Sequence, residues 1–159
     1  MATNNGHERL EMWFKEVKAF AVDMAYEAEV PQQLFLLRSD GLVQGGIMDG
    51  DPQGMLYHIL KKEKPEAFVM VCEARYKVCE CDEVHTPDEG CTEQTRRGEI
   101  AEDVNNPEAL VVIGMARGGK PRVEMAKITG TIPDLDIEDW QEDGAFKGAL
   151  AEIAMEVMR

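Results

Sequence analysis

The chain has 159 residues, and its 31 acidic against 17 basic residues give a formal net charge of −14. That length is sufficient for one domain, residues 1–159, with its own hydrophobic core. The acidic balance argues against binding to nucleic acid or to an anionic membrane, since both need basic side chains. The most apolar stretch, Ala109–Ala116, is far shorter than a membrane-spanning helix, and the N-terminal residues lack the apolar core of an export signal. We therefore expect a cytoplasmic protein.

The first quarter of the chain predicts a long helix and a β-hairpin. Apolar residues recur at three- and four-residue steps from His7 to Glu29, which is typical of an amphipathic helix. Strands are expected at Gln33–Arg38 and Leu42–Met48, because the residues between them include Gly41, which suits a tight turn. The pair Gly45 and Gly46 weakens the second strand, so we expect a bulge there.

A strand buried on both faces is the central element that the sequence predicts. A helix that starts at Asp51-Pro52 precedes it. The strand is expected at Ala67–Cys81, where Phe68–Val71 is apolar at every position; such a run favours cover on both sides of the sheet. From Glu73 onward, polar and apolar residues alternate, so one side of the strand is expected to face water. A long polar loop, residues 82–107, follows.

The remaining chain predicts a second hairpin and a last helix. Strands are expected at Ala109–Ala116 and Arg122–Ile128, joined by a turn at Gly118-Gly119. The last helix is expected to run from about Ile137 to the C-terminus. Its predicted core residues are Trp140, Phe146, Leu150, Ile153, Ala154 and Val157. Together these elements predict an α+β domain with a five-stranded, mostly antiparallel sheet, one face of which is covered by the long N- and C-terminal helices.

Residues 67–112 resemble a group of uncharacterised bacterial and prophage proteins. The resemblance is carried by Phe68–Ala74, a strand of the type apolar-x-Glu-Ala, and by Glu102–Val112, where a charged Asn-Pro segment leads into an apolar strand. Arg75 stands where that group usually has an aromatic residue. The resemblance implies a shared fold and a microbial, cytosolic setting, and it implies no activity.

One cluster has the residue types of a metal site, namely Cys79, Cys81, His85 and Cys91. Thiolates and imidazole are ligands of tetrahedral zinc, and four of them would close a structural site. The spacing differs from that of familiar zinc fingers and ribbons, which have a two-residue gap within each ligand pair. The alternative is four reduced thiols, with Cys72 in the core, and a disulfide is a further alternative.

The sequence lacks a complete set of catalytic motifs. It has no phosphate-binding glycine loop, no Gly-x-Ser-x-Gly elbow and no His-Glu-x-x-His segment. We therefore expect a small non-enzymatic binding or accessory protein, phage-related by its resemblance and without a cofactor other than the candidate structural zinc. One alternative is a hydrolase or redox enzyme that pairs Cys79 or Cys81 with His85. Another is an acidic inhibitor that imitates nucleic acid.

The expected partner is another protein or a second copy of the chain. Trp13, Met115, Met125 and Trp140 provide more apolar surface than one small sheet requires. We therefore expect self-association through a sheet edge or a terminal helix.

Overall fold

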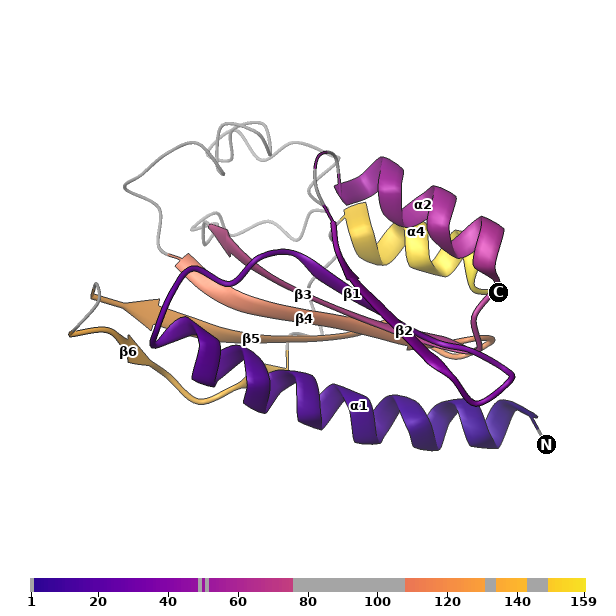
Figure 1. Cartoon of the computed structure of the whole chain (residues 1–159), viewed down its shortest axis with the longest axis horizontal. Helices are drawn as coiled ribbons and strands as arrows, with labels where there is room; N and C mark the ends of the chain where they lie inside the picture. Colours follow the sequence, from indigo (N-terminus) through magenta and orange to yellow (C-terminus); the bar gives the residue numbers. More distant parts are fainter. Residues whose placement is uncertain (1, 49, 51, 76–107, 131–133, 143–148) are drawn as a thin grey trace, which may run out of the picture.

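The computed structural model describes residues 2–48, 50, 52–75, 108–130, 134–142 and 149–159 (Figure 1). Its helices are α1 (Ala2–Ala25), α2 (Pro52–Glu63) and α4 (Ala149–Val157). Its longer strands are β1 (Gln33–Leu37), β2 (Val43–Ile47), β3 (Ala67–Arg75), β4 (Glu108–Ala116) and β5 (Arg122–Thr129). Two short strands follow, β6 (Asp136–Ile137) and β7 (Gln141–Glu142).

All of these strands belong to one antiparallel sheet. Its order is β2-β1-β3-β4-β5, and both β6 and β7 pair with the outer side of β5. The predicted α+β class, the antiparallel sheet and its five main strands are thus confirmed. Both predicted hairpin turns are present, and Gly41 and Gly118 adopt the positive φ angles that such turns need.

The sheet is covered on both faces (Figure 1). Helix α1 packs along β3 and β4 on one face, whereas α2 and α4 pack against each other on the other face. Each face has its own hydrophobic cluster: one includes Phe14, Val69 and Val71, and the other includes Phe68 and Met70. Each of the four β3 residues among these is at most 1% exposed, which confirms the prediction of a doubly covered central strand.

The prediction that both terminal helices cover one face is wrong, because α1 and α4 lie on opposite faces. Hydrophobic periodicity shows which side of a helix is buried, but it leaves open which face of the sheet that side covers. The apolar run of β3 presents two faces to be covered. Helix α1 covers one of them, and the shorter α2 and α4 cover the other side by side.

The last helix does not begin at Ile137 as predicted. Ile137 lies in β6, and Gln141 lies in β7. Ile137 and Trp140 pack against the cluster under α1, whereas Leu150 and Ile153 of α4 pack against the cluster on the other face. One straight helix from Ile137 could not place its residues on both faces of the sheet. Phe146 lies outside the described residues.

The predicted bulge at Gly45 and Gly46 is also wrong. The register between β1 and β2 is unbroken from Gln33 opposite Ile47 to Leu37 opposite Val43. Gly45 instead lies directly beneath the ring of Phe35, whose Cδ1 atom would be 3.0 Å from a β-carbon at this position. An aromatic ring over a strand glycine covers the backbone that the missing side chain leaves bare.

Gly114 in β4 allows α1 to approach the sheet closely. A β-carbon at this position would lie 2.9 Å from Leu10 Cδ1, 3.0 Å from Phe14 Cδ2 and 3.1 Å from the carbonyl oxygen of Phe68. The first two of these atoms belong to core side chains of α1, which are 6% and 0% exposed. The space that a side chain would need is therefore already filled by the helix.

We expect the Gly114→Ala variant to lower the free energy of unfolding by about 1–3 kcal/mol, because the added methyl group overpacks the contact between α1 and β4. Gly46→Ala is the matched control, since a β-carbon there has no atom within 4 Å. We expect its stability to stay within about 0.5 kcal/mol of the parent. Urea unfolding of the three proteins measures both effects. Equal stabilities for the two variants would contradict the close packing of α1 on Gly114.

Candidate functional site

The four predicted zinc ligands, Cys79, Cys81, His85 and Cys91, lie outside the described residues, as does the whole predicted loop, residues 82–107. The zinc site and the thiolate–imidazole pair therefore stay predictions. The described residues contain no cluster of three or more His, Cys, Asp or Glu side chains that could hold a metal ion.

Cys72, near the end of β3, is a core residue as predicted. It is 8% exposed and belongs to the cluster on the side of α2 and α4. Burial, together with the nearby carboxylate of Glu73, raises the pKa of the Cys72 thiol to about 11. The thiol therefore stays protonated at neutral pH, which makes it a poor nucleophile and a poor metal ligand.

Glu73 has a structural role at the same end of β3. Its carboxylate accepts a 2.9 Å hydrogen bond from the backbone amide of Val30, which holds the segment after α1 against the sheet. Partial burial raises the pKa of Glu73, and the charges of Glu108 and Glu29 raise it further, while the bond from Val30 acts in the opposite direction.

A second group of charged side chains lies between α1 and β5. The carboxylate of Glu124, 7% exposed, forms ion pairs of 3.0 Å with Lys18 Nζ and 3.1 Å with Arg122 Nη2. The contact to Arg122 is close enough for an ion pair but lacks hydrogen-bond geometry, so Glu124 Oε2 has charge compensation without a hydrogen bond. Arg122 also lies over the ring of Phe14. The charged side chains of this group and the ring of Phe14 belong to α1 and β5, the two elements that the group joins. This arrangement indicates that the group holds α1 against the sheet.

Among the described residues, one surface feature that packing does not explain is the outer edge of β2. β2 is the last strand at its side of the sheet, and no described strand pairs with its outer edge. Four of its five residues are exposed, and Ile47 is 64% exposed. The opposite side of the sheet differs, because β6 and β7 there cover part of β5.

The hydrogen bonds to β1 determine which backbone groups of β2 point outward. The amide of Arg38 donates to the carbonyl of Leu42, and the amide of Met48 donates to the carbonyl of Gln32. Residues 42, 44, 46 and 48 therefore face β1, because backbone bonds alternate along an antiparallel strand. The amide and carbonyl groups of Val43, Gly45 and Ile47 point away from the sheet.

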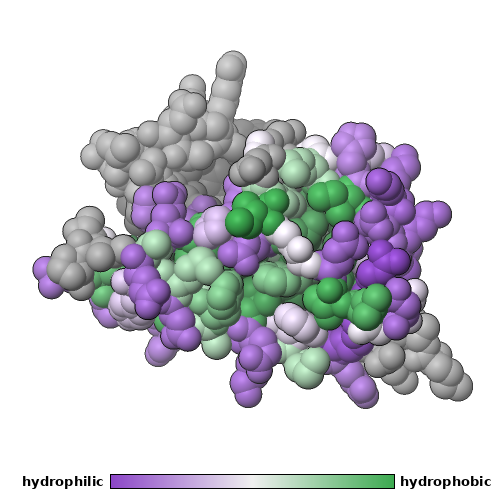
Figure 2. Space-filling view, in the orientation of Figure 1, coloured by the Kyte–Doolittle hydropathy of each residue, from purple (hydrophilic) through white to green (hydrophobic). Residues whose placement is uncertain are grey.

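In the part of the chain that the structure describes, this edge lacks several features that usually prevent strand pairing. Natural edge strands are protected by lysine, proline, bulges or inward-pointing charges. The segment Leu42–Met48 contains neither charge nor proline, and its register with β1 has no bulge. Figure 2 shows apolar and neutral surface along the line that β2 follows across the front of the molecule in Figure 1.

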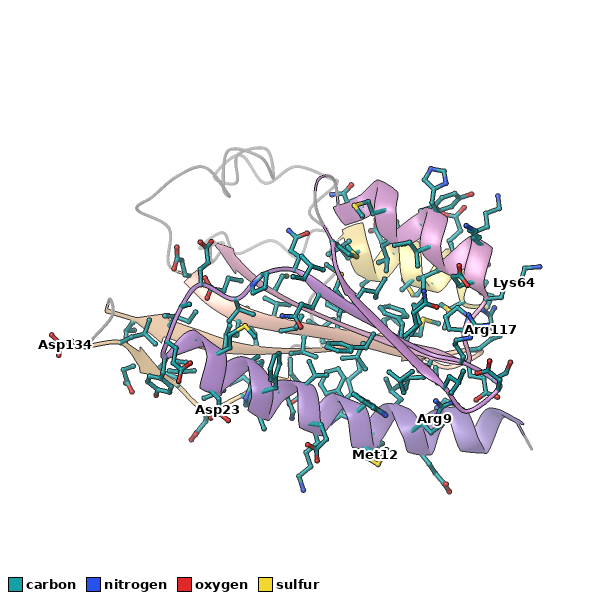
Figure 3. All side chains as sticks on the ribbon, viewed as in Figure 1. Arg9, Met12, Asp23, Lys64, Arg117 and Asp134 are labelled. Atoms are coloured by element: carbon teal, nitrogen blue, oxygen red, sulfur yellow. The ribbon has the colours of Figure 1, made fainter. Side chains whose placement is uncertain are left out.

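The hairpin that carries β2 is fixed to α1. Arg9 of α1 extends toward the β1–β2 hairpin, whereas Met12 points away from the sheet (Figure 3). The Arg9 guanidinium donates hydrogen bonds to the backbone carbonyls of Arg38 and Leu42, the two residues that flank the turn. Asp40 accepts a hydrogen bond from the Leu42 amide within the turn. The edge is therefore held in place by contacts at its turn and by β1.

A shallow groove of about 180 Å³ runs beside the edge, between β2 and α2. The residues that line it include Leu34, Leu36, Gly46, Met48, Met55 and Ile59. Because Gly46 has no side chain and its β-carbon position is open, the groove continues onto the edge strand itself. Its volume is below the roughly 300–1,000 Å³ of typical small-molecule sites, so it suits one side chain better than a substrate.

Comparisons with protein-family models, curated proteins and solved structures found no match, so the functional assignment depends on the site alone. The resemblance of residues 67–112 to bacterial and prophage proteins stays a prediction. Within the described chain, none of the helices has both the length and the apolar character required to cross a bilayer.

The sequence identified neither Ile47 nor Leu42 as a binding residue, although it predicted the strand that contains them. It assigned apolar surface to Met115, which is 1% exposed and belongs to the core. Trp13, Met125 and Trp140 are half-buried and also pack against the two clusters. Of the large apolar side chains that the structure describes, the most exposed are instead Leu42, at 65%, and Ile47. The sequence pattern that could have indicated this site is a predicted strand without charged residues and with two adjacent glycines.

The raised pKa of Glu73 predicts a pH-dependent effect on stability. A carboxyl with a raised pKa in the folded state stabilises the fold below its ordinary pKa of 4.5, and this contribution is lost as pH rises through the folded-state value. Glu73→Gln removes the charge and keeps an acceptor for the Val30 amide. We expect this variant to be more stable than the parent at pH 7, with the difference shrinking toward pH 4.5.

Urea unfolding at several pH values measures this effect. Glu27→Gln is the control, because it makes the same change of charge at an exposed position. An equal pH dependence in both variants would show that overall charge, and not the environment of Glu73, causes the effect.

Proposed function

We propose that the protein is a non-enzymatic binding protein that accepts an extended strand of another protein molecule along the outer edge of β2. The observation that carries this proposal is an exposed edge strand with three outward-facing residues and no charge. Addition of a strand to a sheet edge is a common mode of peptide recognition, in which backbone bonds supply affinity and neighbouring pockets supply specificity. The groove beside Gly46 is such a pocket.

The surroundings of the edge favour an uncharged strand as the ligand. Arg38, at the end of β1, forms ion pairs of 3.3 Å with both Asp40 and Glu63. Arg38 therefore offsets one of the two carboxylate charges, and the negative charge that remains disfavours an acidic ligand. The exposed side chains of Leu42 and Ile47 would instead lose contact with water when an apolar strand binds.

A binding role also agrees with how the described polar groups are used. The thiol of Cys72 is buried and protonated, and the carboxylates of Glu73 and Glu124 have partners from neighbouring elements. We further propose a cytoplasmic setting, on the basis of the resemblance of residues 67–112 to bacterial and prophage proteins.

A displayed library of random heptapeptides tests the proposal. We expect it to yield uncharged, β-branched sequences that shift the backbone NMR signals of β2. The Ile47→Lys variant should bind these peptides about tenfold or more weakly, because a charge then lies on the edge. Met12→Lys is the matched control: Met12 is 56% exposed on α1 and points away from the sheet, so binding should be unchanged.

Two outcomes would contradict the proposal. One is a library without binders for a chain that also stays monomeric at high concentration. The other is a set of binders that Ile47→Lys and Met12→Lys affect equally, since their site would then lie elsewhere on the protein.

A further inference from the structure

We propose that the strand that pairs with β2 is β2 of a second copy of this chain, running antiparallel, with Gly45 facing Gly45 across a two-fold axis. This inference rests on the proposed function, because it identifies the occupant of the same edge. Three features of the edge support it: its backbone pattern, its side chains and its charge.

The outward-facing backbone of β2 is complementary to itself. The three outward-facing residues, Val43, Gly45 and Ile47, are evenly spaced around Gly45. An antiparallel pairing centred on Gly45 therefore places Val43 of each copy opposite Ile47 of the other. Each of the three pairs exchanges two hydrogen bonds, so all the outward-facing amides and carbonyls of β2 find partners. A register shifted by two residues leaves some of them unpaired.

The side chains on the α1 face fit the same register. Ile47 of one copy lies opposite Val43 of the other, and β-branched cross-strand pairs stabilise sheets. Ile47 is 64% exposed in the single chain, so this pair removes apolar surface from water. At the axis the two copies present Gly45, and the ring of Phe35 in each copy lies beside this glycine.

On the α2 face, the register brings a side chain to the groove. Gln44 of the second copy lies opposite Gly46, where the position of a β-carbon is open and the groove begins. Gln44 Oε1 accepts a 3.3 Å hydrogen bond from Arg38 of its own chain, so the aliphatic stem of this glutamine is the part that would face the groove. At the end of the strand, the exposed Leu42 lies opposite Met48 of the second copy.

The charge distribution along β2 lowers the main obstacle to self-association, which is repulsion between acidic chains. A net charge of −14 on each copy opposes dimerisation through most surfaces. The segment Leu42–Met48 carries no charge, and Arg38 forms ion pairs with Asp40 and Glu63 beside it. Asp49 and Asp51 follow the segment in the sequence, so acidic residues flank the uncharged strand. Pairing through β2 therefore brings two acidic chains together along an uncharged strand, with acidic residues only at its ends.

The two-fold pairing also ends the assembly at two copies. Each β2 edge is used by the other copy, and the opposite side of the sheet is partly covered by β6 and β7. A two-fold axis perpendicular to the sheet places the two α2 helices on one face and the two α1 helices on the other. The product is a closed dimer with a continuous sheet.

Analytical ultracentrifugation of the full chain, from about 1 µM to about 1 mM, measures the dimer. We expect a concentration-dependent dimer whose Kd rises about 30-fold or more in Ile47→Pro, since proline removes a donor that is used twice across the axis. Ile47→Thr is the control, because it keeps the amide and the branched side chain and should show a smaller rise. Unchanged circular dichroism would confirm that both variants fold.

Isotope-filtered NMR on a mixture of labelled and unlabelled chains tests the register. In this dimer Gln44 and Gly46 of different copies form a non-hydrogen-bonded pair, with α-carbons about 4.5 Å apart. We expect a nuclear Overhauser effect between their α-protons across copies. Within one copy, the α-protons of Gln44 and Gly46 are two residues apart along an extended strand, which is too far for this nuclear Overhauser effect.

The other possible results distinguish between self-pairing through β2 and the proposed function. A protein that stays monomeric at the highest concentration would overturn self-pairing, while peptide binding at β2 would keep the proposed function. A dimer that is unaffected by Ile47→Pro, or that lacks the contact between Gln44 and Gly46, would place the interface elsewhere and also overturn the inference. Failure of the peptide selection, with a dimer of the expected register, would restrict the edge to a second copy.

Discussion

The burial of β3 on both faces is the constraint from which the rest of the structure follows. The residues from Phe68 to Val71 are apolar at every position, so the sheet is stable only if both of its faces are covered. Helix α1 covers one face, and α2 and α4 together cover the other. The helices cover the two faces of the sheet but not its edges. β6 and β7 cover part of one edge, and β2 forms the other.

Much of the fold could be predicted because its signals are local. The periodicity of α1, the apolar run of β3 and the glycines of the two hairpin turns each lie within a short segment. The errors concern relations between distant segments. Trp140 and Leu150 are both apolar and near in sequence, yet they belong to opposite faces of the sheet, and no local pattern carries that information. The two glycines of β2 predicted a bulge when they were considered alone. The ring of Phe35, which covers Gly45, comes from a different strand, so the segment itself does not show it.

The candidate site was less accessible to sequence reasoning. An open edge is a property of strand order, and strand order follows from which segments pair across the whole chain. The sequence could show that Leu42–Met48 is uncharged, but it could not show that β2 is the last strand of the sheet. Its metal hypothesis depends on Cys79, Cys81, His85 and Cys91 and stays a prediction. The apolar surface that it assigned to Met115 is core, because residue type alone does not distinguish a buried methionine from an exposed one.

Residue-resolved amide hydrogen exchange in β2 tests most directly whether this edge is open and is used for pairing. At low protein concentration, we predict slow exchange at residues 44, 46 and 48, which bond to β1, and fast exchange at Val43, Gly45 and Ile47. At high concentration, these three outward-facing amides should become as slow as their neighbours. Slow exchange at all three in the dilute protein would show that the chain covers its own edge, and unchanged fast exchange in the concentrated protein would show that no second copy pairs there.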